Sequence, residues 1–354
     1  MSHKRYLAYA VVAAILAALV YAQFRTWKGF DWPTFWAQGK EISLRHILQA
    51  IGLIYFSFFL RALRWKIFLR PICPETSVLG LIPPTLIGFT GLTLLGRPGE
   101  LIRPYLIARR TNLSFSSQMA VWTVERIFDV GAFTILLGLA IFWPGTALHF
   151  LPPDIYRSVQ IFGLLFLALA AALSFGAVLV AKFGEALSAG VERRVSRLGS
   201  NLGHHIAQRL REFHGGLDTI HGPVAFVQIV CVSLVMWSCI ALAYLEVTHA
   251  YGAPLAYMTV SMVLLLTGSS MVGSLIQLPG VGGGSQLATI SALQHIFHAS
   301  HELAASCGIL LWLATFVCVV PAGLLLAHRE RLSLRKLSAE SEHEEELAVP
   351  SPGA

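Results

Sequence analysis

The chain has 354 residues, of which 55% are hydrophobic and only 13% are charged. Soluble domains carry about 25% charged residues, so this composition excludes an ordinary soluble globular protein. In a soluble protein the formal net charge of +7 would suggest nucleic acid. Here we assign it to Lys and Arg at membrane surfaces, because no basic-aromatic nucleic-acid module is visible, and we expect no nucleic-acid partner.

Residues 1–30 are predicted to form an N-terminal signal-anchor helix, because Lys4 and Arg5 precede an apolar run. A cleaved signal peptide is the alternative, and we favour retention because no secreted domain follows. The next segment, 31–45, begins with an Asp-Trp-Pro tripeptide that is typical of a helix start. Its aromatic residues share one helical face, which predicts a short interfacial helix with Trp at headgroup depth.

Apolar segments near the length needed to cross a bilayer, about 20 residues, recur along the chain. Six of them are predicted full spans: 6–23, 46–68, 117–143, 157–182, 224–249 and 302–327. Two more, 78–95 and 254–277, are interrupted soon afterwards by clusters of Pro and Gly. The sequence therefore predicts an all-α polytopic membrane protein with about six full transmembrane helices and two re-entrant hairpins.

The distribution of Lys and Arg among the loops favours this topology. If all eight apolar segments were full spans, the basic linker 183–222 would lie outside, against the positive-inside rule. If 78–112 and 254–299 are re-entrant hairpins, the linker and both termini are cytoplasmic. Only the basic segment 24–45 remains an exception. We therefore expect a multi-pass protein of the plasma (inner) membrane, with residues 331–354 as a disordered tail.

The two hairpins also suggest an internal repeat. Each hairpin lies between two full spans, which gives a first unit at about 46–143 and a second at about 224–327. The second unit would be inverted relative to the first, and each hairpin breaks at a Pro-Gly pair. Inverted repeats with broken helices that meet near the midplane are a transporter architecture, so the pattern favours transport.

The first hairpin contains the sequence Gly-Arg-Pro-Gly-Glu at residues 96–100. Pro and Gly interrupt a helix there, and broken backbone at membrane depth must line a cavity or be buried in protein. Arg97 and Arg103 offer planar forks suited to phosphate oxygens, and Glu100 could pair with either. The alternative is a cytoplasmic loop that contacts anionic headgroups.

The span that follows carries three charges close together, Glu125, Arg126 and Asp129. The two carboxylates are four residues apart and share one helix face, and Arg126 can neutralise Asp129. Charges in an apolar helix should face the protein interior. They could contact a substrate, or brace the hairpin through a salt bridge to Arg97 or Arg103, and the two roles are compatible.

The second hairpin turns at Pro279-Gly280, followed by Gly282, Gly283 and Gly284. These glycines allow close backbone approach, and a helix that begins near Ser285 could present its N-terminus to a phosphate. An ordinary flexible loop is the alternative. Farther along, three histidines at 295–301 lack zinc-ligand spacing, and none of the five cysteines forms a CxxC pair. We therefore expect no metal site and no cofactor.

Glu246 is an isolated acid near the end of its span, with His249 close by. We assign it to the membrane interface in preference to a proton-coupling site.

These motifs resemble the lysylphosphatidylglycerol synthase transmembrane-region family. Residues 96–103 resemble its GRxGExxR signature, residues 125–129 its ERxxD element, and residues 279–286 its PGGxGxxE element. The third element departs from the family, because Val281 replaces Gly and Gln286 replaces Glu. The resemblance covers about 40–330 and implies a flippase-like domain at 31–330, in a stand-alone member without the aminoacyl-transferase domain.

We therefore predict a lipid translocator, a transporter rather than a catalyst. The predicted substrate-binding residues are those of the three elements: Arg97, Glu100, Arg103, Glu125, Arg126, Asp129, Pro279, Gly280, Gly283 and Gln286. The expected partner is a membrane lipid (a phospholipid, hopanoid or polyprenyl-linked lipid), together with a possible lipid-modifying enzyme. The alternatives are an integral-membrane transferase acting on a lipid-linked substrate and a non-catalytic scaffold for a lipid-modifying enzyme.

Overall fold

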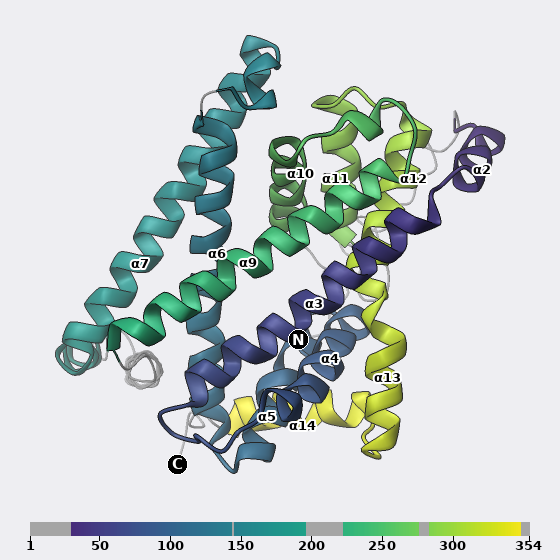
Figure 1. Ribbon diagram of the computed structural model, residues 1–354. Helices are drawn as coiled ribbons and strands as arrows, with labels where there is room; N and C mark the ends of the chain where they lie inside the picture. The colour runs from purple at the N-terminus through teal and green to yellow at the C-terminus, as the bar shows by residue number, and fades with distance from the viewer. Residues whose placement is uncertain (1–29, 144, 196–221, 276–282, 348–354) are drawn as a thin grey trace, which may run out of the picture.

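The computed structural model describes residues 30–143, 145–195, 222–275 and 283–347. Every regular element in these ranges is a helix, as the composition predicts (Figure 1). Five helical segments are long and apolar enough to cross a membrane: Leu44–Leu69, Val78–Leu95, Pro153–Leu173, Pro223–His249 and His301–Arg329. The polytopic all-α fold class is therefore confirmed. The predicted signal-anchor helix lies outside the described residues.

The first half of the membrane domain, residues 44–142, contains a long helix, a broken hairpin and a second long helix. It is preceded by the short helix α2 (Trp32–Lys40), which Asp31 caps at its N-terminus. The elements of the half are α3 (Leu44–Leu69), α4 (Val78–Leu95), the 3-10 turn η1 (Arg97–Leu101), α5 (Ile102–Thr111) and α6 (Phe115–Phe142). The break between α4 and α5 falls at the predicted Gly-Arg-Pro-Gly sequence.

The second half, residues 222–329, repeats this order after a connection through η2 (Ala147–Phe150) and the long helix α7 (Pro153–Val195). Its elements are α9 (Gly222–His249), η3 (Leu255–Tyr257), α10 (Val260–Gly273), α11 (Gly283–His295), α12 (His301–Trp312), the π-turn η4 (Leu313–Val317) and α13 (Val319–Arg329). Only the start of the basic linker, 183–195, is described, and it continues α7.

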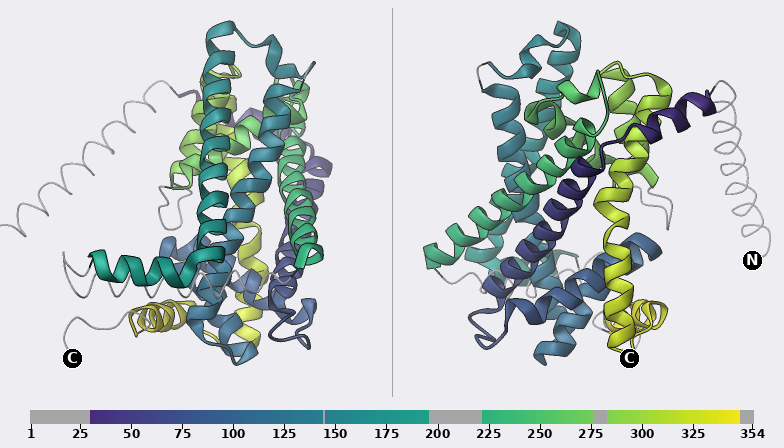
Figure 2. Two further views of the ribbon diagram at one scale, coloured as in Figure 1. Left: turned by 90° about the vertical axis from the view of Figure 1, so that its left-hand side faces the viewer. Right: turned by 45° about the vertical axis from the view of Figure 1, so that its right-hand side comes forward.

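The two hairpins lie at opposite ends of the molecule. In Figure 1, α4 and α5 are at the lower end and α10 and α11 at the upper end, while α3 and α9 run side by side between them. This is the arrangement that an inverted repeat requires, although the depth of each hairpin in a bilayer stays a prediction. Figure 2 shows the same separation from two other directions.

Both hairpins are closed by contacts between glycines. A Cβ on Gly99 of η1 would overlap the backbone of Gly91 in α4, and a Cβ on Gly273 of α10 would overlap the backbone of Gly284 in α11. Side chains at these points would push the two arms apart, so glycine fixes their separation. The same device therefore shapes hairpins that are otherwise unlike in sequence.

Two prolines lie inside α4, and a hairpin residue compensates for one of them. Because Pro84 has no backbone N–H, it cannot bond the carbonyl of Gly80. Arg110, near the end of α5, donates to this carbonyl instead and also pairs with Glu330. The Gly80 carbonyl of α4 therefore has a hydrogen-bond donor despite Pro84. The pair with Glu330 also joins the end of α5 to the end of α13.

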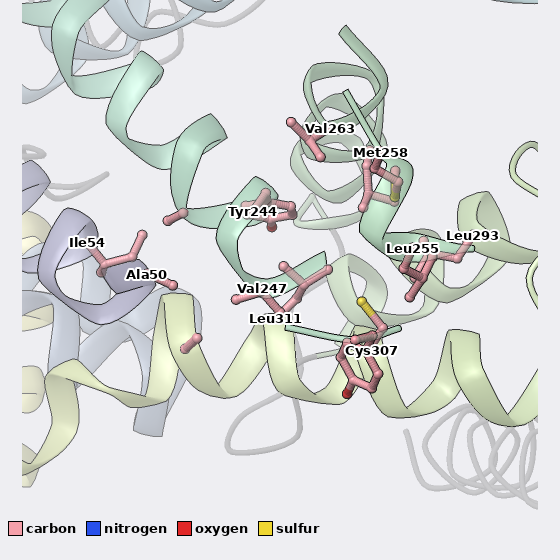
Figure 3. Packing of buried hydrophobic residues seen from close by; sticks show 14 of the residues in the cluster. Ala50, Ile54, Tyr244, Val247, Leu255, Met258, Val263, Leu293, Cys307 and Leu311 are labelled. Carbon is pink, nitrogen blue, oxygen red and sulfur yellow. The ribbon is translucent and has the colours of Figure 1, made fainter. Parts of the chain in front are cut away.

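The main hydrophobic core joins the two halves. It contains Ile54 of α3, Tyr244 of α9, Val263 of the second hairpin and Leu311 of α12 (Figure 3). The outer surface is apolar as well, since α7 exposes a series of large residues that includes Leu164, Leu165 and Leu167. An apolar exterior around a packed core is what a bilayer requires.

The predicted disordered tail is wrong for residues 334–347, which form helix α14 (Leu334–Leu347). Leu337 is buried in a small cluster with Ile102 and Leu106 of α5. The Tyr105 hydroxyl donates to the Glu340 carboxylate at 3.0 Å. The acidic composition suggested disorder, but an apolar face with a docking surface on α5 is enough to order this segment.

Candidate functional site

The site is built on α6, which holds two carboxylates inside the protein. Glu125 and Asp129 are 0% and 2% exposed and lie one helical turn apart on the same face. Helices α3, α5 and α9 pack around this face and bring arginine or polar side chains to it. Buried carboxylates of this kind need charged or hydrogen-bonding partners.

Arg64 of α3 joins both carboxylates. Its Nη2 donates to Glu125 Oε1 at 2.6 Å, and its Nη1 donates to Asp129 Oδ1 at 2.7 Å. Nη1 also donates to the Ser233 hydroxyl of α9 at 2.8 Å. Arg64 is 0% exposed, so this planar fork holds α3, α6 and α9 together from within.

Arg103 of α5 reaches the same carboxylate from the hairpin. Its Nη2 pairs with Glu125 Oε2, and its Nη1 donates to Oε1 at 3.2 Å. The guanidinium lies 4.4 Å from the ring centroid of Trp65 and 5.3 Å from that of Phe89. Gly88 of α4 makes this approach possible, because a Cβ there would overlap the Cβ of Arg103.

Two further arginines share the second oxygen of Asp129. Arg126 Nη2 lies 3.2 Å and Arg61 Nη1 lies 3.6 Å from Asp129 Oδ2. Arg126 is the accessible member of the site, with 42% of its side chain exposed. Arg61 is 8% exposed, and its guanidinium lies 4.9 Å from the Phe89 ring centroid. Neither Nε nor Nη1 of Arg61 has a hydrogen-bond partner.

We call these six residues the arginine network: Arg61, Arg64, Arg103, Glu125, Arg126 and Asp129. It contains four guanidinium groups and two carboxylates, and so carries a formal charge of +2. A buried net charge in a membrane domain is costly and is typical of a functional site. The network can bind an anion through its arginines.

The structure brings together four of the predicted site residues, Arg103, Glu125, Arg126 and Asp129. It also resolves a choice between partners, because Arg103 pairs with Glu125 and not with Glu100. Glu100 is half-buried at the edge of the network and interacts electrostatically with Arg126. The predicted brace between α6 and the hairpin is therefore present.

Arg97 lies outside the network and connects the hairpins. Its guanidinium is exposed and donates to the backbone carbonyl of Leu275, just beyond the end of α10. The broken segment of the first hairpin thus contacts the second hairpin directly. Contact between the two breaks is expected if hairpins from opposite sides meet within the membrane.

The second hairpin is described only in part, since Pro279, Gly280 and Gly282 lie outside the described residues. Gly283 is buried with a φ of 54° and is the first residue of α11. The helix therefore begins two residues before the predicted start. Gln286 lies half-buried in the first turn of α11.

Sequence reasoning missed Arg61 and Arg64. Both lie within the predicted span 46–68 and within α3. Their spacing of three places them on one face of an otherwise apolar helix. Two arginines on one face of a predicted span are a signal for a buried site, and this signal could have identified them.

Glu246 has a partner at the other end of α3. His46 Nδ1 lies 2.6 Å from Glu246 Oε2, and the His249 ring centroid is 6.3 Å from that of His46. Both members of the pair are partly exposed. This pair links α3 to α9 far from the arginine network.

A protein-family model described as "Lysylphosphatidylglycerol synthase TM region" matches residues 7–323. No curated protein and no solved structure matches the chain. The matched range includes the whole arginine network and both hairpins.

Proposed function

The chain belongs to the lysylphosphatidylglycerol synthase transmembrane-region family, and from this premise we propose that it is a lipid translocator. It would move a lipid with an anionic headgroup between the two leaflets. Family membership supports a lipid-related role in a membrane. The finer assignment rests on the charge and position of the arginine network.

The observation that carries the proposal is a largely buried site with a formal charge of +2 that includes Arg103 of the first broken hairpin. A protein that needed charges only to brace its helices would pair each arginine with a carboxylate. Here Arg61 and Arg126 share one carboxylate oxygen, so the cationic excess is available to a ligand. Phosphate oxygens suit planar guanidinium forks.

We assign different roles in lipid binding to the arginines of the network. Arg64 would fix the two carboxylates, and Arg103 would tie the hairpin to them. Arg126, with 42% of its side chain exposed, would make the first contact with the headgroup. The lipid tails would stay in the bilayer. Transfer would require the Arg97–Leu275 contact between the hairpins to open and close.

We place the protein in the plasma membrane with both termini cytoplasmic. The loop charges favour this orientation. The ends of α5 and α13 lie at the same end of the molecule as α14 (Figure 1), and they carry Arg109, Arg110 and Arg329. A cytoplasmic first hairpin would receive a lipid from the inner leaflet.

A transferase is the less favoured alternative. A general base needs a carboxylate that is free to accept a proton. Glu125 contacts three arginines and Asp129 contacts three, which makes either a poor base. A scaffold remains the other alternative, and it requires no exchange of lipid at all.

Leaflet exchange in proteoliposomes tests the proposal. Headgroup-labelled anionic lipids would be incorporated, and the outer-leaflet label would then be quenched chemically. We expect exchange above that of empty liposomes for the native protein and its loss in Arg126→Gln. Arg109→Gln is the matched control, because Arg109 is an exposed hairpin arginine outside the network.

Equal exchange by the native protein and Arg126→Gln would remove the network from the mechanism. Absence of exchange for every lipid tested, with folded protein confirmed in the vesicles, would contradict translocation.

A further inference from the structure

The two carboxylates of the arginine network are divided unequally among its four arginines. Arg64 engages Glu125 and Asp129 through separate nitrogens. Arg103 takes the second oxygen of Glu125. Arg126 lies 3.2 Å from Asp129 Oδ2 and 3.3 Å from Glu125 Oε2, whereas Arg61 lies 3.6 Å from Asp129 Oδ2 alone. The positive charge is therefore in excess on one side of the network, at Arg61 and Arg126.

We infer that this side binds a terminal phosphate with two negative charges, as in a phosphomonoester lipid, and that Arg61 recognises the second charge. The inference rests on the proposed function and names the headgroup that the site would take. A phosphodiester headgroup carries one negative charge and would leave the network positive. The second proton of a phosphomonoester has a pKa of about 6, so this group approaches two charges at pH 7.

Arg61 has the features expected of a ligand-binding residue rather than a brace. It is 8% exposed, and its Nη1 has no hydrogen-bond partner, whereas both Nη atoms of Arg64 donate to carboxylates. The 3.6 Å from Nη1 to Asp129 Oδ2 exceeds hydrogen-bond length. A buried guanidinium donor without an acceptor is costly, and a ligand that accepts from Nη1 would recover this cost.

The surroundings of Arg61 agree with an anionic ligand. Its guanidinium lies 4.9 Å from the Phe89 ring centroid, and Arg103 is 5.3 Å from the same centroid. Glu100, at the edge of the network, offsets part of the charge of Arg126, so the excess positive charge is greatest at Arg61. A cationic headgroup would add to the positive charge, so the site disfavours an aminoacylated lipid.

The test compares phosphatidic acid with phosphatidylglycerol of the same acyl chains in the proteoliposome assay, with empty liposomes subtracted. At pH 7.5 we expect phosphatidic acid to exchange about tenfold faster or more, because hydrogen bonds to charged groups are strong. The preference should disappear near pH 5, where the phosphomonoester carries one charge. A polyprenyl phosphate, which has the same headgroup chemistry and a different tail, is assayed alongside them to show whether the protein also discriminates between lipid tails.

Variants assign the preference to Arg61. Arg61→Gln should slow phosphatidic acid exchange more than phosphatidylglycerol exchange and so remove the advantage of phosphatidic acid, whereas Arg61→Lys should keep part of this advantage. Lys66→Gln, on the same helix but outside the network, should behave as native. Melting temperature and size-exclusion profile verify that each variant is folded.

Equal exchange of the two lipids, or an equal loss of both in Arg61→Gln, would overturn the inference and leave translocation standing. If no lipid exchanges, the proposed function fails instead. In that case the inference is tested by the binding of short-chain lipids to the protein in detergent, measured by the change in tryptophan fluorescence. Tighter binding of phosphatidic acid that depends on Arg61 would support it, and equal binding would overturn it.

Discussion

The two halves of the membrane domain have the same order of elements but very different interiors. In 44–142 five buried side chains are charged: Arg61, Arg64, Arg103, Glu125 and Asp129. Among the described residues of 222–329, the buried polar side chains all carry hydroxyl groups: Ser233, Thr248, Thr267, Ser270, Ser285, Thr289, Ser306 and the tyrosines Tyr244 and Tyr251. One half concentrates charge, and the other stays neutral.

Under the proposed function, this difference separates two tasks that lipid translocation must combine. The charged half provides electrostatic recognition, because guanidinium groups act over several ångströms in a low-dielectric interior. The neutral half is held by local hydroxyl bonds, such as Tyr244 to Ser270 at 2.9 Å and Tyr251 to Ser306 at 2.9 Å. Each such bond contributes less than a buried ion pair, so under the proposed function we expect the neutral half to move against a fixed charged site.

The largest effect is expected from removing the centre of the charged half. Arg64→Met leaves Glu125 and Asp129 without the fork that joins them. Breaking a buried ion pair by removing one partner costs about 3–5 kcal/mol, because a buried charge is left uncompensated. We expect a large fall in melting temperature and little folded protein in detergent. Size-exclusion chromatography with fluorescence detection measures both.

Lys66→Met is the control for this prediction, since Lys66 lies on α3 and is half-buried outside the network. A melting temperature for Arg64→Met within a degree or two of the control would show that the network does not stabilise the charged half. The two halves would then differ in headgroup recognition but not in how buried polar groups stabilise them.

Much of the fold followed from hydropathy, because apolar length and loop charge report directly on membrane spans. The segments 46–68 and 224–249 coincide closely with α3 and α9. The site was harder to predict, because partner choice depends on packing. The sequence allowed Arg103 to pair with Glu100 or Glu125, and only the close approach of α5 to Gly88 decides for Glu125.

Features without a local sequence signal could not be predicted. The π-turn at Leu313–Val317 is stabilised by Tyr55, whose hydroxyl donates to the Cys318 carbonyl at 2.8 Å. That bond spans most of the chain, so no window of sequence contains it. Helix α14 depends in the same way on an apolar surface provided by α5.

A second prediction tests what the two halves share. Gly99→Ala and Gly273→Ala each place a methyl group against the backbone of the opposite hairpin arm. Overpacking of this kind costs about 1–3 kcal/mol, and we expect a similar fall in melting temperature for both. Gly131→Ala is the control, because no atom lies within 4 Å of its Cβ position on α6. Destabilisation in only one half would show that the hairpins are not closed alike.

A third prediction concerns the neutral half alone. Tyr244→Phe removes the donor to Ser270 and leaves the ring in place. The loss of one hydrogen bond costs about 1 kcal/mol, well below the cost expected for Arg64→Met. Thermal unfolding in the same detergent measures the difference. A cost equal to that of Arg64→Met would mean that the hydroxyl bonds are as rigid as the charged network, and the proposed division of tasks would fail.

The smallest effect is expected where the halves meet at their far end. His46 of α3 and Glu246 of α9 form a partly exposed pair at 2.6 Å. Exposed ion pairs, which this pair forms only when the imidazole is protonated, contribute about 0.2–1 kcal/mol and are screened by salt. Glu246→Gln should therefore lower the melting temperature only slightly at low salt and not at all near 1 M salt. If the loss persisted in high salt, the pair would be shielded from solvent, and a second charged site, shared by both halves, would exist at the end opposite the arginine network.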